Sequence, residues 1–180
     1  MGNPQNASLW RNADVYVATD LNATNPADAD TPFGAEWGLV GLLDGDDGFE
    51  DERDEDREDH YAWGGIIVRT SRKNFKLTRK VTLLEDNEVT RQLIWPGSTE
   101  TEIVVPRPIP VKIAFETREG ARVRRLITRS HGEFDLDGAI KESEAGLTKY
   151  PVAATIFPSG EGVLFDVLDN RAAVEVETTG

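Results

Sequence analysis

Two neighbouring segments of opposite charge constrain the fold of this chain more than any other feature. Residues 44–59 read DGDDGFEDERDEDRED and contain eleven carboxylates against two arginines. Residues 66–81 read IIVRTSRKNFKLTRKV and contain six Lys or Arg and no acid. Opposite charges attract, so the two segments are suited to meet, within one molecule or between copies of it. We expect them to meet between copies, which predicts a protein that assembles.

The acidic run has a period of two that suits an extended strand. One side of such a strand would present Asp51, Arg53, Glu55, Arg57 and Asp59, and the other Glu50, Glu52, Asp54, Asp56 and Glu58. The second side would be wholly acidic, and we interpret it as a wall that repels DNA phosphates or as a contact face. Two alternatives stay open: a disordered, solvated loop, and an acidic patch that docks a basic partner.

The basic run is interpreted as the complementary face for a neighbour's acidic segment. Its six cations are Arg69, Arg72, Lys73, Lys76, Arg79 and Lys80. A nucleic-acid patch is the weaker interpretation, because exposed aromatic residues are not interleaved with these cations and the whole chain has a net charge of −13. Contacts between opposite charges predict an assembly that is sensitive to salt.

Composition excludes several classes. With 180 residues the chain is expected to form one domain over residues 1–180, with an acidic insertion at residues 44–65 and a C-terminal segment, residues 171–180, of unassigned packing. The sequence has no Cys, no apolar run of the roughly 18–20 residues needed to span a membrane, and no secretion signal at its start. These features predict a soluble product of a cytoplasm.

Alternating apolar and polar residues predict strands through most of the chain. The predicted strands cover residues 14–19, 36–43, 75–83, 111–116, 122–128, 152–157, 163–168 and 173–176. A turn-rich surface loop is expected over residues 20–32. Many short strands with Gly or Pro breaks predict a mainly β fold, an antiparallel sandwich or barrel.

One segment predicts a short α-helix, at residues 86–95. Asp86 and Asn87 can accept the free N–H groups of a first turn, Val89 and Leu93 are four residues apart, and Pro-Gly follows. A second, polar segment at residues 138–144 predicts another short helix.

Residues suited to catalysis or metal binding are few. His60 and His131 lie far apart in the sequence, with no nucleophile motif, so we expect surface histidines and no enzyme. Residues 44–48, DGDDG, resemble the start of a calcium-binding loop, but position five is Gly48 and position six is Phe49, so the spacing of the ligands fails. We therefore expect no catalytic residues, no cofactor and no metal ligands.

Several motifs together resemble a known family. They are WGLVGLL at residues 37–43, YAWGG at 61–65, VTLLEDNEVTRQLIWPG at 81–97 and LTKYPV at 147–152. In order and spacing these segments, over roughly residues 12–168, look like the major tail tube proteins of long-tailed phages, most of all those infecting actinobacteria.

The resemblance implies a β-sandwich-like subunit with a flanking helix. Six such subunits would close a ring through a continuous inner barrel, and stacked rings would form a tube for genomic DNA, with residues 44–65 reaching the adjacent ring. The implied partners are copies of the chain, a tape measure protein and tail terminator or tip proteins, without a membrane. The implied location is the virion, after synthesis in the host bacterial cytoplasm. The alternative function is an acidic, calcium-dependent surface binding module.

Overall fold

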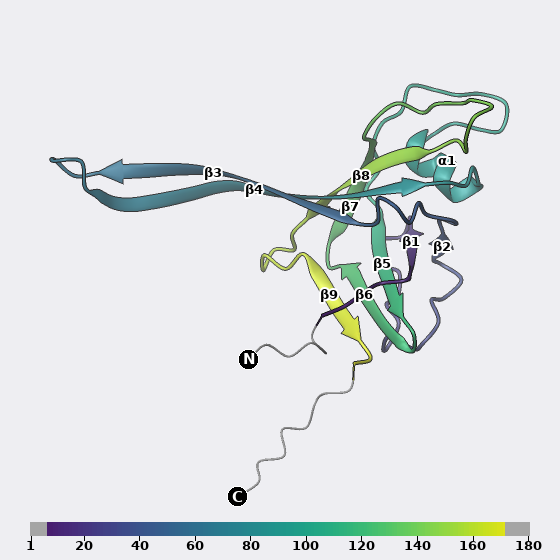
Figure 1. Ribbon diagram of the computed structural model, residues 1–180, viewed down its shortest axis with the longest axis horizontal. Coiled ribbons are helices and arrows are strands. Elements are labelled where there is room, and N and C mark those ends of the chain that lie inside the picture. Colours follow the sequence, from purple (N-terminus) through teal and green to yellow (C-terminus); the bar gives the residue numbers. More distant parts are fainter. Residues whose placement is uncertain (1–6, 172–180) are drawn as a thin grey trace, which may run out of the picture.

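Two antiparallel sheets face each other in the computed structural model, which describes residues 7–171 (Figure 1). The strands are β1 (Asn12–Ala18), β2 (Gly38–Leu39), β3 (Glu50–Tyr61), β4 (Ile67–Leu83), β5 (Lys112–Glu119), β6 (Arg122–Thr128), β7 (His131–Leu136), β8 (Tyr150–Phe157) and β9 (Phe165–Asp169). One sheet has the order β2-β1-β5-β6-β9 and the other β3-β4-β8-β7. The expected mainly β fold with one short helix is confirmed.

The main hydrophobic core lies between the two sheets. Alternate residues of β1, β4, β5 and β8 point into it, so that Val15, Ile113 and Phe115 are almost fully buried opposite Val81 and Val152. Where β5 begins, Val111 exchanges backbone hydrogen bonds with Gly132 of β7, with N–O distances of 2.9 and 2.8 Å. The two sheets are therefore joined at one corner.

The long loop before β2 covers the outer face of the five-stranded sheet. Trp37 and Ala23 pack there against Ala114 and Ile127. Lys112 donates a hydrogen bond of 2.6 Å to the backbone carbonyl of Ala23. This face is thereby buried, and the expected loop over residues 20–32 forms a cover for the sheet.

The single helix, α1 (Glu88–Ile94), begins where the sequence predicts it. Asn87 is its N-cap and accepts a hydrogen bond of 2.9 Å from the backbone N–H of Thr90. Leu93 and Ile94 are buried in the main core. The second helix predicted over residues 138–144 is wrong: Gly138 has a φ of 153°, and apart from a bridge between Ser143 and Gly146 the segment is irregular.

The strand predicted at residues 36–43 is much shorter, because Gly41, with a φ of 102°, turns the chain out of the sheet. The strand predicted at 75–83 begins earlier, at Ile67. The strand predicted at 173–176, and the C-terminal segment beyond residue 171, lie outside the described residues. No helix in the described part of the chain is long and apolar enough to cross a membrane.

Candidate interaction site: the β3–β4 hairpin

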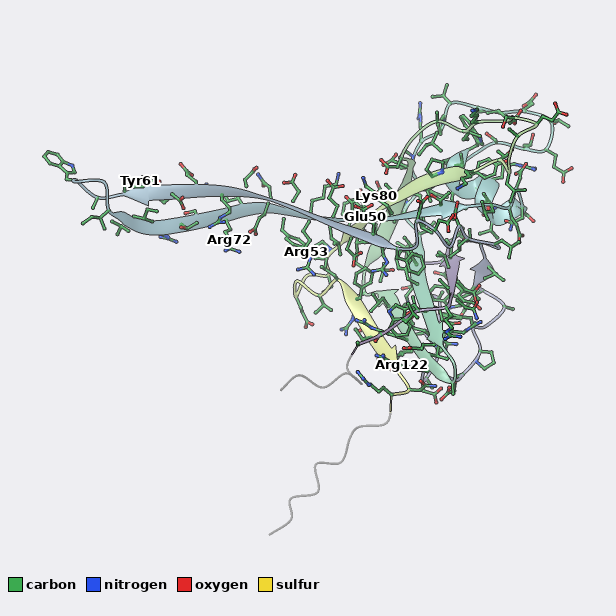
Figure 2. All side chains as sticks on the ribbon, in the orientation of Figure 1. Glu50, Arg53, Tyr61, Arg72, Lys80 and Arg122 are labelled. Atoms are coloured by element: carbon green, nitrogen blue, oxygen red, sulfur yellow. The ribbon has the colours of Figure 1, made fainter. Side chains whose placement is uncertain are left out.

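Strands β3 and β4 form a long hairpin that projects from the two sheets (Figures 1 and 2). Only the last part of β4, from Leu77 to Leu83, also pairs with β8. The part of the hairpin beyond Leu77 is therefore a ribbon of two strands, which we call the shaft. The twelve residues of β3 span roughly 40 Å when extended.

A tight turn closes the hairpin at its far end. The N–H of Ala62 donates to the carbonyl of Ile66 at 2.8 Å, and the N–H of Gly65 donates to the carbonyl of Ala62 at 3.1 Å. Gly64 and Gly65 have φ values of 92° and 80°, which side chains with a Cβ rarely adopt. The Gly-Gly pair is thus required by the turn.

The acidic and basic segments meet within one molecule. The register pairs Glu50 with Lys80 at the base and Tyr61 with Ile67 at the far end. The ion pairs across the hairpin are Arg72–Glu55 at 3.0 Å, Lys73–Glu58 at 3.8 Å, Arg79–Asp51 at 2.9 Å and Lys80–Glu52 at 3.2 Å. The two segments therefore meet within one molecule, whereas we expected from the sequence that they would meet between copies.

The hairpin has no net charge. Residues 50–83 contain eight Asp or Glu and eight Lys or Arg, so all of the chain's net charge of −13 lies elsewhere. An isolated two-stranded ribbon is marginally stable in water, and exposed ion pairs contribute about 0–1 kcal/mol each. The two ion pairs within the shaft, Arg72–Glu55 and Lys73–Glu58, therefore help to hold it extended.

The acidic face predicted for one strand becomes a face of mixed charge in the hairpin. Residues Glu50, Glu52, Asp54, Asp56 and Glu58 do share one side of β3, as the alternation predicts. The same side of β4, however, presents Arg69, Lys73, Lys76 and Lys80. This face of the hairpin is a row of acids beside a row of cations. Hydrogen bonds to Glu52 and to Asp137 raise the pKa of Lys80.

The six predicted cations do not form one basic face either. Arg72 and Arg79 lie on the opposite side of β4, and Arg79 is only 7% exposed. Its guanidinium carbon lies 4.8 Å from the ring centres of both Phe49 and Phe115. Burial lowers the pKa of Arg79, and the ion pair with Asp51 opposes that shift. Arg79 is therefore part of the edge of the hydrophobic core and not of an exposed basic face.

A β-bulge in the shaft keeps the acids of β3 and the cations of β4 on the same side of the hairpin. Between the pairs Asp54↔Lys76 and Asp56↔Lys73, β4 has one residue more than β3. Asn74 takes up the extra length with a φ of 56°, and its side-chain amide donates to the Asp56 carboxylate at 2.7 Å. Asn is one of the few residues with a side chain that tolerates this conformation.

The far end of the hairpin is an exposed apolar surface, which we call the tip. Its large side chains and their exposed fractions are Tyr61 (61%), Trp63 (101%), Ile66 (68%), Ile67 (54%) and Val68 (67%). Residues 61–68 contain no charge. Contiguous apolar side chains this exposed are typical of interaction surfaces. The sequence shows the signal, five large apolar residues around Gly-Gly between two charged runs, but in the sequence-based prediction residues 61–65 served only as a motif of the family resemblance.

The residues considered for metal binding and catalysis are engaged in local contacts. Asp44 forms an ion pair with Lys149, which holds the pKa of the Asp44 carboxyl below its usual value. His60 lies 3.0 Å from the hydroxyl of Ser71, and His131 stacks on Phe157. In residues 7–171, Asp, Glu and His do not gather in groups of three that could hold a metal ion.

A comparison with known protein families finds no family model that matches this chain, and a comparison with curated proteins finds no match.

Proposed function

We propose that this protein is a structural subunit that assembles with copies of itself into stacked rings, forming the tail tube of a long-tailed phage. In this proposal the rings are hexameric and the tube is the path of the genome into the host. Tape measure and terminator or tip proteins would meet the tube at its inside and its ends. The protein would act in the virion and would not be an enzyme.

The exposed tip is the observation that supports self-assembly most strongly. A two-stranded shaft holds it away from the two sheets, so the chain's own core cannot cover it. Trp63 is fully exposed, and burial of a large apolar side chain stabilises by about 1.5–3 kcal/mol. A partner that covers the tip would therefore gain substantial binding free energy.

Free strand edges add to this support. β3 and β7 are the outer strands of one sheet, and β2 and β9 are the outer strands of the other. Unpaired edges can pair with strands of neighbouring molecules, and subunits that join their sheets in this way can close a barrel. The sequence motifs that resemble tail tube proteins direct the proposal to this particular assembly.

The mixed charge of the hairpin changes the role proposed for its acids. Glu50, Glu52 and Asp54 lie beside lysines, so we assign this face to contact between subunits rather than to a uniformly negative channel wall. Opposite charges are already paired in the chain, and the tip is uncharged. Assembly in this proposal depends mainly on apolar burial and therefore resists salt, in contrast to the sequence-based expectation.

Negative-stain electron microscopy of the concentrated, purified chain tests the proposal. We expect rings or open tubes about 100 Å wide with a central channel, which is the size of an inner barrel with one surrounding layer of domains. Compact particles of one chain, or irregular aggregates without a channel, would contradict a tube subunit.

A further inference from the structure

Each chain has, besides its tip, a groove that is a candidate receiving surface for the tip of another copy. A groove of about 760 Å³ opens beside the base of the hairpin, between the two sheets. Its apolar lining includes Leu9, Trp10, Leu42 and Phe49, and the side chains of Leu9 and Leu42 are 67% and 66% exposed. A cavity of this size is in the range that holds several large side chains.

The groove also contains a cationic side chain with unused hydrogen-bonding capacity. Arg124 lines the groove, and within residues 7–171 its guanidinium takes part in no ion pair. An incoming group that supplies an oxygen atom or an aromatic ring would be stabilised beside this guanidinium.

The tip has the complementary chemistry. Trp63 and Tyr61 are aromatic rings that can stack on guanidinium groups. The backbone carbonyls of Trp63, Gly64 and Gly65 accept no hydrogen bond from any described residue. The tip itself carries no charge, so no ion of the tip is desolvated when it is buried.

The groove cannot receive the tip of its own chain. The twelve residues of β3, roughly 40 Å when extended, separate the tip from the hairpin base, where Gly48 and Phe49 line the groove. We propose that the tip, residues 61–68, of one copy inserts into this groove of a second copy. The proposal rests on the self-assembly proposed above and adds its receiving surface.

A contact of this kind can be repeated from one copy to the next. The donor and acceptor surfaces are different parts of the molecule, so each copy that inserts its tip leaves its own groove open for the next. If successive copies are aligned along the hairpin, the repeat distance is set by the length of β3, roughly 40 Å. This is a head-to-tail contact, as stacked rings require.

Site-specific cross-linking tests the contact, because the chain has no Cys of its own. Ala62→Cys places a thiol beside Trp63, and Leu42→Cys places one on the rim of the groove. Val105→Cys is the control, since Val105 is 85% exposed in a different apolar loop. Each variant is first shown to sediment as the unmodified chain does. Ala62→Cys is then mixed with Leu42→Cys or with Val105→Cys, and each mixture is treated with a short bismaleimide.

We expect a cross-linked dimer for Ala62→Cys mixed with Leu42→Cys and none above background with Val105→Cys. If the mixtures assemble but the tip links to Val105→Cys, to itself or to neither site, the groove is not the acceptor while self-assembly stands. If nothing assembles, the proposed function fails together with this contact. Leu9→Cys replaces Leu42→Cys should the latter variant not assemble.

Truncation of the tip gives an independent measurement. Trp63→Ala is expected to raise the concentration needed for assembly by about 10-fold or more, as for a central anchor residue of an interface. Val105→Ala, the matched control, should leave it unchanged. Equal assembly of the two variants would show that the tip is not an anchor.

Discussion

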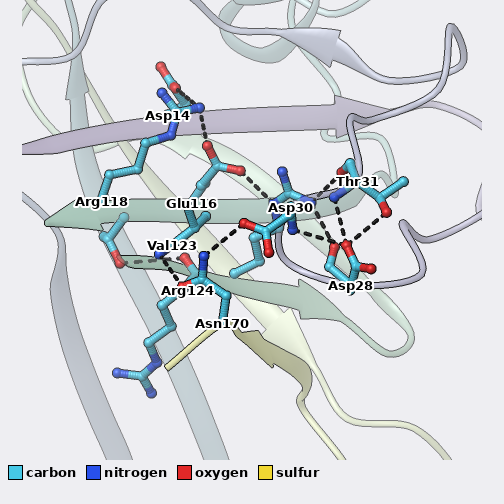
Figure 3. Close-up of polar contacts among 11 residues, drawn as sticks. Asp14, Asp28, Asp30, Thr31, Glu116, Arg118, Val123, Arg124 and Asn170 are labelled. Carbon is cyan, nitrogen blue, oxygen red and sulfur yellow. Dashed lines mark hydrogen bonds and ion pairs between the residues drawn. The ribbon is translucent and has the colours of Figure 1, made fainter. Parts of the chain in front are cut away.

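Glu116 is a fully buried carboxylate on the outer face of the five-stranded sheet (Figure 3). It accepts a hydrogen bond of 2.5 Å from Arg125 and forms an ion pair with Arg118, which also binds Asp14. Arg125 donates further hydrogen bonds to backbone carbonyls of the covering loop. One charged group therefore links three strands to the loop that shields them.

Replacing Glu116 should be costly for this reason. Glu116→Gln leaves the guanidinium of Arg125 buried without its carboxylate, and we expect the free energy of unfolding to fall by about 3 kcal/mol. Urea denaturation followed by tryptophan fluorescence measures the change. Glu144→Gln, at an exposed position, is the control and should alter stability little. Similar stability of the two variants would mean that Glu116 does not organise this face.

The charge pattern of the sequence predicts on which side of a strand a residue lies, but not whether that residue is buried. The alternation of β3 correctly separates Glu50 from Asp51, because successive side chains of any strand point to opposite sides. The burial of Arg79 could not be predicted, because it depends on Phe49 and Phe115 both packing against its guanidinium. Such tertiary contacts join residues that are far apart in the sequence.

Among the elements, the corner between β5 and β7 depends on the absence of a side chain at one position. A Cβ at Gly132 would lie 2.5 Å from Cδ1 of Ile113 and 3.2 Å from the carbonyl oxygen of Thr155. Ile113 is fully buried, so it has little room to move. The close approach of the two sheets therefore needs glycine at this position.

Gly132→Ala should destabilise the fold by about 1–3 kcal/mol, as overpacking of a dense core does. Gly146→Ala is the matched control, because a Cβ at that position meets no atom within 4 Å. The midpoints of thermal unfolding of both variants measure the effect. No difference between the two midpoints would show that the corner can relax around a methyl group.

The elements differ in how well their sequence predicts them. The helix has a local stop and start signal, with Asn87 as its cap, and its position is predicted correctly. The pairing of β3 with β4 is not predicted correctly. Complementary charge indicates that two segments attract each other, but it does not indicate whether they belong to the same molecule. The turn decides this, since Gly64 and Gly65 reverse the chain within five residues.

At the scale of the whole molecule, the chain has an apolar, uncharged tip at the end of a ribbon and a groove near the ribbon's base. The mainly β fold follows from alternation and turn residues. The exposed tip and the groove could not be predicted in the same way. The exposure of Trp63 depends on how far the hairpin extends beyond the part of β4 that pairs with β8.

The central claim is that the tip is covered only when another copy is present, and light scattering of the purified chain over a range of concentrations tests it most directly. We expect a particle mass that rises well above that of one chain as concentration increases, both at low salt and at about 1 M salt, where exposed ion pairs are screened. A mass equal to one chain at every concentration and in both salts would contradict it.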